Sequence, residues 1–440
     1  MSQGSPPAAA TAVATSPGSP SVAAGPPAVV EASAGPPTSR SRIRDTPQRL
    51  RLLTVEVIAA GLVVGLVGAL TFAYLAFSLN RAEADATQLI RVQKIQTNLL
   101  SADATATNAF LVGGLEPPAQ RAAYDNAMVA ASTLIADAAQ AQPADAEALS
   151  VLNQQLVSYA ASIEQARANN RQGLPVGAQY LRVASTQLRG TAIPVLDNLV
   201  QSNADRAADE MDVRIGYLAV TIALLGLAAV VLIQVWVARR FRRRINPGLL
   251  LSSIVLLLGV VIGLIGVQQL NGSVKAIKNG SYTALNVAAA ARIDANNAKS
   301  NESLTLIARG SGQSFETAWS ASSDSVSKNL SYLVDQTDLQ TKWQAYTQVH
   351  RAIRTLDDGG SWEAAVARAT GTGDDSANTT FGSFDASLTS YLEQVSDTTS
   401  GSLSERQPGL VIGSILILLA GIAAALLGRW GLAARLKEYR

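Results

Sequence analysis

The stretch RRFRRRINPG, residues Arg239–Gly248, decides the fold. It places five arginines within six residues, between two long apolar runs, Ile215–Ala238 and Leu249–Leu270. Each run is long enough to cross a bilayer, which takes about 20 apolar residues. Short cytoplasmic loops beside membrane spans hold Lys and Arg. The sequence therefore predicts a basic cytoplasmic turn at 239–248 between two transmembrane helices, 215–238 and 249–270.

Two further apolar runs, Leu52–Leu79 and Leu410–Leu432, predict a first and a fourth transmembrane helix. The first run begins after residue 50 and is too long for the apolar core of a signal peptide. Basic residues precede it, and basic residues also follow the fourth run in the segment 433–440. By the same charge rule, both chain ends are expected in the cytoplasm of a multi-pass plasma-membrane protein, and segments 80–214 and 271–409 outside it.

Residues 1–45 consist mainly of Pro, Ala, Ser and Gly. A segment of this composition cannot bury enough apolar surface to offset the entropy lost on folding, so a disordered cytoplasmic tail is expected. Arginines at its end, just before the first span, are expected to contact anionic membrane lipids.

Segment 80–214 has helical periodicity throughout and predicts a four-helix bundle. Apolar residues recur at helical spacing, and breaks occur at Gly113–Gly114, after Pro143 and at Gly173–Pro175. The last helix is expected to kink near Pro194. The first and last helices are expected to continue into the membrane helices without a break.

Segment 271–409 follows the same plan, because its helix breaks and flanking spans occur in the same order and at similar spacing. Gly310 follows Gly114 by 196 residues, and a short helix, Trp362–Thr370, lies after the glycine pair Gly359–Gly360. We interpret this as an internal duplication. The predicted fold is an all-α membrane protein with four transmembrane helices and two tandem extracytoplasmic four-helix bundles.

The composition excludes several classes of chemistry. The 440 residues include no cysteine and one histidine, His350, which argues against disulfides, thiolate metal sites and catalytic triads. The sequence has no phosphate-binding loop, dinucleotide fingerprint or zinc-protease motif. We expect no enzyme activity, no cofactor or metal, and no nucleic-acid partner. His350 is expected at the surface or boundary of its helix rather than as a ligand or base.

Two kinds of surface are candidates for binding. The loops at the membrane-distal tips are one, because recognition often resides on loops held by a rigid scaffold. Their candidate residues are Gly113, Gly114, Glu116, Arg171, Gly173, Arg309, Gly310 and Trp362. Trp362 can instead cap the core of its bundle. The bundle walls are the other: Arg91, Lys94, Arg182 and Arg189 could receive a carboxylate, but scattered charges on a solvated face explain them equally well.

The arginines of the turn are candidates for coupling to a cytoplasmic partner. The turn is one of only three predicted cytoplasmic surfaces, with the tail and the carboxyl end. Its coupling candidates are Arg239, Arg240, Arg242, Arg243 and Arg244.

Two motifs carry a resemblance to a known family. FLVGGLEPPAQRAAY (Phe110–Tyr124) and GSWEAAVARATGTGDDSANTTFGSFD (Gly360–Asp385) are similar to stretches of actinobacterial proteins. With the tail, the tandem plan and the absence of cysteine, residues 45–440 resemble the GlnX family of actinobacterial transmembrane proteins. Bundles whose end helices enter the membrane also resemble the sensory modules of bacterial chemoreceptors and histidine kinases, although no output domain follows here.

The resemblance implies partners on both sides of the membrane. These are an extracytoplasmic amino-acid-binding lipoprotein, GlnH, and a cytoplasmic Ser/Thr kinase, protein kinase G. It implies a protein that relays amino-acid availability, aspartate or glutamate included. Two alternatives are open: a direct small-molecule receptor and a non-signalling membrane scaffold. A homodimer and an internal pseudo-dimer of the two bundles are both open as well.

Overall fold

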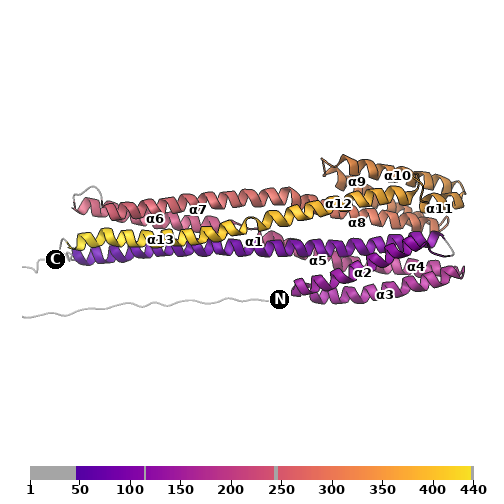
Figure 1. Ribbon diagram of the computed structural model, residues 1–440, viewed down its shortest axis with the longest axis horizontal. Coiled ribbons are helices and arrows are strands. Elements are labelled where there is room, and N and C mark those ends of the chain that lie inside the picture. Colours follow the sequence, from indigo (N-terminus) through magenta and orange to yellow (C-terminus); the bar gives the residue numbers. More distant parts are fainter. Residues whose placement is uncertain (1–45, 113–114, 242–245, 438–440) are drawn as a thin grey trace, which may run out of the picture. The chain divides into compact units, whose positions relative to one another are not determined.

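The computed structural model describes residues 46–112, 115–241 and 246–437, and every regular element in these ranges is a helix (Figure 1). The all-α prediction is confirmed for this part of the chain. The elements are α1 (Thr46–Val112), α2 (Pro118–Ala141), η1 (Pro143–Asp145), α3 (Ala146–Arg171), α4 (Val176–Gln187), η2 (Leu188–Ala192), α5 (Ile193–Glu210), α6 (Arg214–Phe241), α7 (Pro247–Asn279), α8 (Ser281–Ile307), α9 (Gln313–Ser331), α10 (Thr337–Asp358), α11 (Trp362–Thr370), α12 (Ala377–Ser404) and α13 (Gln407–Leu436).

Four helical segments each contain an apolar stretch long enough to cross a membrane. They are Gln48–Val112, Val176–Arg240, Pro247–Ile307 and Ala377–Leu436, within the described residues. Each segment contains one of the four apolar runs of the sequence. The chain therefore has the architecture of a multi-pass helical membrane protein.

The apolar parts of these segments pack through glycine at close crossings. A Cβ atom on Gly421 of α13 would lie 2.6 Å from the carbonyl oxygen of Gly61 on α1 and would also collide with Gly65. Small residues let helix backbones approach in this way inside a membrane. Polar bonds add to the packing, since Ser252 of α7 donates to the carbonyl of Ala424, 2.8 Å away.

One apolar core is formed by α2, α3, α4, η2, α5 and the second half of α1. Its largest buried members include Tyr124, Tyr159 and Ile163. The leucines of α3 at Leu149, Leu152 and Leu156 lie on one helix face and are all buried here, as their spacing predicts. We call this cluster the first core.

A second core is formed by α8, α9, α10, α11 and α12. Trp343, Tyr346 and Phe384 are its largest fully buried side chains. The ring centroids of Trp343 and Phe384 lie 4.9 Å apart, which is a favourable aromatic contact. Leu111, at the end of α1, also belongs to this second core.

Helices α1 and α8 are joined by buried polar contacts. Gln93 of α1 donates to Asn286 of α8 over 3.1 Å, and Ser300 of α8 donates to Asp103 of α1 over 2.8 Å. Thr107 is also within 3.4 Å of Ser300. The face of α1 that points away from the first core is therefore covered too. This explains why α1 buries both apolar and polar residues.

Three predicted helix continuities are wrong. Between α5 and α6 the chain leaves the helix at residues 211–213, and the Asp212 carboxylate accepts from the Arg214 N–H, 2.9 Å away. Asp212 thus caps the new helix. Between α7 and α8 the break falls at Gly280, where a Cβ atom would lie 2.7 Å from the Ala276 carbonyl oxygen.

Between α12 and α13 the helix restarts at Gln407, because Pro408 suits a first turn but cannot continue a helix. Only α1, of the described helices, runs through from its apolar run into a core without a break. The predicted irregularity near Pro194 takes the form of the π-helix η2, which ends directly before it. Proline has no N–H and crowds the preceding turn, which accounts for the widened turn.

Candidate functional site

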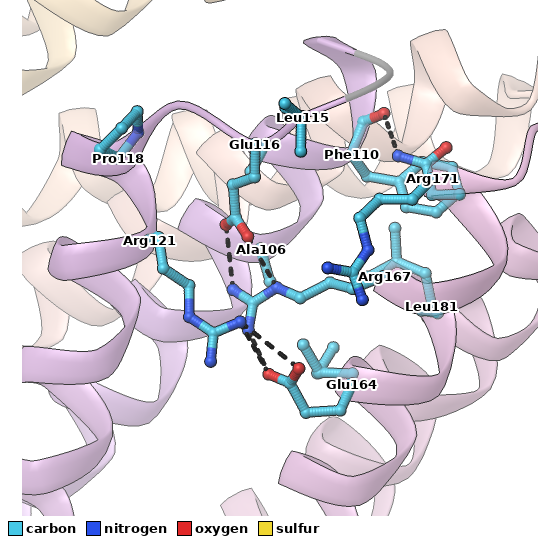
Figure 2. A pocket seen from close by; sticks show the side chains of 14 residues that line it. Ala106, Phe110, Leu115, Glu116, Pro118, Arg121, Glu164, Arg167, Arg171 and Leu181 are labelled. Atoms are coloured by element: carbon cyan, nitrogen blue, oxygen red, sulfur yellow. Dashed lines mark hydrogen bonds and ion pairs between the residues drawn. The ribbon is translucent and has the colours of Figure 1, made fainter.

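A pocket of about 250 Å³ lies at the end of the first core that is farthest from the apolar run of α1 (Figure 2). It is bounded by the last turns of α1 and α3, the first turn of α2 and the segment before it, and part of α4. Its lining residues are Ala106, Ala109, Phe110, Leu115, Glu116, Pro118, Arg121, Ile163, Glu164, Ala166, Arg167, Asn170, Arg171 and Leu181. We call it the tip pocket.

Arg167 is the most firmly held charged group in the tip pocket. Its guanidinium bonds both oxygens of Glu116, at 2.9 and 3.0 Å, and reaches Glu164 at 2.7 Å. It also lies over the ring of Tyr124, 4.1 Å from the centroid. Only 12% of the Arg167 side chain is exposed. A bidentate, partly buried pair of this kind fixes the geometry of the segment before α2.

The other two arginines of the tip pocket differ in their partners. Arg121 is bonded by Asp125 at 2.9 Å and by Glu164 at 3.1 Å. Arg171 forms no hydrogen bond or ion pair with any residue that the structure describes. In Figure 2 its side chain extends into the pocket beside Arg167, and no dashed line reaches its guanidinium. The tip pocket therefore contains one arginine that is available to a ligand.

The predicted tip residues of segment 80–214 lie only partly together in the structure. Glu116 and Arg171 both line the tip pocket. Gly173 has a φ of +66° and ends α3: the Leu174 N–H donates to Asn169, and the Gly173 N–H donates to Asn170. This is a Schellman ending, so Gly173 has a structural role at the edge of the site. Gly113 and Gly114 lie outside the described residues.

The predicted tip residues of segment 271–409 form a separate cluster. The guanidinium of Arg309 lies over the Trp362 ring, 3.8 Å from its centroid, and Trp362 Nε1 donates to the Leu306 carbonyl over 2.9 Å. Arg309 and Gly310 both have positive φ values, 41° and 78°. Trp362 packs on the second core, in line with the alternative that it caps that core.

Asp103 is a fully buried carboxylate between the two cores. It accepts from Tyr159 at 3.2 Å and Ser185 at 2.5 Å, and it pairs with Arg189 at 2.7 Å. It also accepts from Ser300 of α8. Arg189 belongs to η2, so the π-helix carries the cation that neutralises Asp103. Burial first, and then the charge of Asp103, raise the pKa of Tyr159 well above its usual 10.

Arg189 departs from the solvated face that was the preferred explanation for the charges on the bundle walls. It receives a carboxylate, that of Asp103, and only 26% of its side chain is exposed. Arg91 and Arg182 bond only glutamines of their own helices, and Lys94 is exposed, as the expectation of solvated charges requires.

His350 was expected at a surface or boundary and is instead buried, with 1% of its side chain exposed. Its Nδ1 lies 2.9 Å from Glu302 and its Nε2 lies 3.2 Å from Glu316. Trp319 stacks on the imidazole at 3.5 Å between centroids. Lys299 bonds Glu302 at 2.7 Å. These paired charges explain how the polar ring is accommodated inside the second core.

The predicted coupling arginines are only partly described. Arg239 and Arg240 are exposed in the last turn of α6. Arg242, Arg243 and Arg244 lie outside the described residues. No group of three or more His, Asp or Glu side chains in the described part of the chain is arranged to hold a metal ion.

Sequence reasoning missed Asp103, Arg121, Glu164 and Arg167. The spacing of Glu164 and Arg167, three residues apart on α3, is a visible signal for an ion pair. Asp103 had a weaker signal, which is an acidic residue directly after the core-facing Ala102.

One family model matches the part of the chain that contains the tip pocket. Residues 78–212 match the family model of the actinobacterial sensor domain. This region contains the second half of α1 and all of α2 to α5, and therefore every residue that lines the tip pocket. The region is similar to sensor domains, which indicates a sensing role. Searches among curated proteins and solved structures found no match.

Proposed function

We propose that the chain is a membrane-bound signal transducer that relays amino-acid availability from outside the cell to a cytoplasmic Ser/Thr kinase. The observation that carries this proposal is α1. It is one helix of 67 residues, which contains an apolar run at one end and the wall of the tip pocket at the other. The 32 residues from Leu79 to Phe110 rise roughly 45 Å, at about 1.5 Å per residue.

A single helix can transmit a displacement over this distance, because its hydrogen-bonded backbone is stiff. Small shifts of helices at packed interfaces are an established mode of switching. The contacts between α1 and α8 supply such an interface, since Asp103 and Gln93 of α1 form hydrogen bonds with residues of α8. The similarity of residues 78–212 to sensor domains supports the same role.

The proposal includes two tandem bundles produced by duplication. The spacing of the helices supports it: α1 and α8 end 195 residues apart, at Val112 and Ile307, and α2 and α9 begin 195 residues apart, at Pro118 and Gln313. In this arrangement both cores lie outside the cell. The two chain ends and the arginine turn face the cytoplasm, which follows the charge rule.

The proposed outer partner is an amino-acid-binding lipoprotein of the GlnH type, and the proposed inner partner is a kinase of the protein kinase G type. The resemblance to the GlnX family supports both. Leu115 is the best candidate for an outer contact, because 83% of this large apolar side chain is exposed beside the tip pocket. Exposed apolar residues at a surface often mark protein contacts.

The test is cross-linking between the full-length protein in membranes and the purified lipoprotein. We expect Leu115→Asp to abolish the cross-link, because it places a charge in an apolar contact. Val129→Asp is the matched control, since Val129 is an exposed apolar residue on the wall of α2. It should leave the cross-link unchanged.

A second measurement addresses the relay itself. A strain that lacks the protein should lose the change in kinase activity that follows the addition of amino acids. A normal response in that strain would reject the transducer and favour a scaffold. An unchanged cross-link in the Leu115→Asp variant would reject the docking surface.

A further inference from the structure

We propose that the tip pocket binds a small organic carboxylate directly, with Arg171 as the anion-binding side chain and an apolar floor for the carbon chain. This inference rests on the sensing role proposed above and adds the chemical class of a ligand to it. It differs from docking of a lipoprotein, because Arg171 and the apolar floor hold the ligand, whereas Leu115 lines the same pocket but is 83% exposed.

The ion pairs of the lining leave one arginine without a counter-charge in contact. Three arginines and two glutamates line the tip pocket. Asp125, outside the lining, pairs with Arg121 and brings the local charges into balance, so the case for an anion rests on Arg171, which forms no ion pair with these carboxylates. Both glutamates are already bonded by Arg167 or Arg121. Neither glutamate is therefore available to bind a cation.

Arg171 is the group that a ligand can use. Arg167 and Arg121 are held by carboxylates, whereas Arg171 makes no hydrogen bond or ion pair with the described residues. Its guanidinium extends into the pocket (Figure 2). A planar guanidinium offers two parallel N–H donors that match the two oxygens of a carboxylate. The ligand's carboxylate would thus occupy the place of a missing counter-charge.

The apolar part of the lining disfavours an inorganic anion such as phosphate. Ala106, Phe110, Ile163 and Leu181 provide apolar surface on α1, α3 and α4. Phosphate or sulfate would gain nothing from this surface, whereas a short carbon chain would be removed from water there. The pocket volume of about 250 Å³ is below the ~300–1,000 Å³ of typical ligand sites. This limits the ligand to a small molecule.

The experiment uses the full-length protein in lipid nanodiscs, titrated calorimetrically with isovalerate, L-leucine, L-glutamate and inorganic phosphate. We expect isovalerate to bind and phosphate to bind more weakly. Arg171→Ala should weaken isovalerate binding by roughly tenfold or more, because a charge-assisted pair is lost. Arg171→Lys should lie between the two, since it keeps the charge but loses the bidentate geometry.

Arg182→Ala is the matched control. Arg182 is on α4, bonds only Gln179 and does not line the tip pocket. The Arg182→Ala variant should bind isovalerate as tightly as the wild type does. Leucine and glutamate establish whether the site accepts an added ammonium or a second carboxylate, and tighter binding of either one through Arg171 supports the carboxylate class.

Three results would overturn the inference: no isovalerate binding by the wild type at millimolar concentrations, equal binding of phosphate, or unchanged binding by Arg171→Ala. None of them affects the lipoprotein cross-link or the cellular response described above. Conversely, a normal response in the deletion strain would reject the relay while the calorimetric result would stand. The two proposals can therefore fail separately.

Discussion

Asp103 joins five elements through one buried carboxylate: α1 carries it, and α3, α4, η2 and α8 supply partners. Asp103→Asn removes the charge that faces Arg189 while keeping the size of the side chain. Breaking a buried ion pair costs about 3–5 kcal/mol. Because Arg189 is 26% exposed, we expect a smaller loss of about 1–3 kcal/mol, measured by chemical unfolding in detergent.

The control for this prediction is Asp125→Asn. Asp125 pairs with Arg121 on the surface of α2, and both side chains are more than 40% exposed. Such a pair contributes about 0–1 kcal/mol. Equal losses in the two variants would contradict the view that Asp103 is a structural junction.

The second core should show a pH dependence that comes from His350 and Glu302. Burial alone would lower the pKa of His350, but the hydrogen bonds that its ring donates to Glu302 and Glu316, and the charges of these carboxylates, raise it above 6.5. Its stabilising contribution is therefore complete below pH 6.5 and is lost as pH rises through the raised pKa of the folded state. Lys299 and Arg354 are the cations beside the two glutamates.

Glu302 makes the stability of the second core depend on pH in the acidic range. Burial alone would raise its pKa, but the charge of Lys299 and the hydrogen bond to His350 lower it to about 2 from 4.5. Its contribution is complete above pH 4.5 and is lost as pH falls toward 2. Glu302 lies beyond the apolar run of its segment, outside the predicted span.

Thermal unfolding from pH 4 to pH 9 tests this expectation. The wild type should lose stability above pH 6.5, while His350→Gln should show a flatter profile there. His350 is the only histidine of the chain, so the difference between the two profiles reports this one group. A wild-type stability that rises from neutral to alkaline pH would contradict the assignment.

At the residue scale, position along the chain predicted part of the site. Glu116 and Arg171 were found because they flank helix ends, where recognition loops occur. Arg167, the partner of Glu116, was not found, because a charged residue on an amphipathic helix has the same local pattern whether it is solvated or paired. His350 and Arg189 failed for the same reason, since a counter-charge from another helix leaves no trace in local sequence.

At the scale of elements, the crossing of α1 and α13 depends on glycine. A Cβ atom on Gly421 would meet the backbone of both Gly61 and Gly65. Gly421→Ala should push the helices apart and destabilise the protein by about 1–3 kcal/mol, the usual cost of overpacking. The measurement is thermal unfolding of the purified protein in nanodiscs.

Gly259→Ala is the control for the helix crossing. Gly259 lies in the apolar run of α7, and nothing is within 4 Å of its added Cβ atom. This variant should unfold at the wild-type temperature or slightly above it, because alanine favours the helix over glycine. A similar loss in both variants would mean that the effect comes from glycine itself and not from the crossing.

The helices themselves were largely predictable, and their interruptions were not. Apolar spacing, Pro118 and the glycine pair at Gly359–Gly360 predicted where helices begin and end. The breaks at Met211–Val213 and Gly280 were missed, because they depend on contacts made after folding. Glu210, for example, is held by Arg81 of α1 at 2.8 Å, directly before the first of these breaks.

At the scale of the whole molecule, the pairing of α1 with α8 lay beyond sequence reasoning. Their contact faces include Gln, Asn, Ser, Thr and Asp, which resemble solvated positions. Periodicity separates apolar from polar faces, but it cannot identify a polar face that is covered by another helix. The proposed internal duplication would account for such a face, since two similar modules in one chain can bury equivalent helices against each other.

The final prediction concerns the proposed topology of the chain in the membrane. The chain contains no cysteine, so one introduced cysteine reports the side of the membrane on which it lies. We expect Val129→Cys and Tyr332→Cys, both at exposed positions, to react with an impermeant maleimide in right-side-out vesicles. Lys437→Cys should react only in inside-out vesicles.

The pattern of labelling tests the two central spans together. Val129 and Tyr332 lie on opposite sides of the arginine turn along the chain, with two apolar runs between them. If both runs cross the membrane, both cysteines must react from the same side. Reaction from opposite sides would mean that one of these two runs does not cross, and the relay through α1 would then need a different arrangement. Joint reaction from outside, with Lys437→Cys protected, would place both cores where an extracytoplasmic signal can reach them.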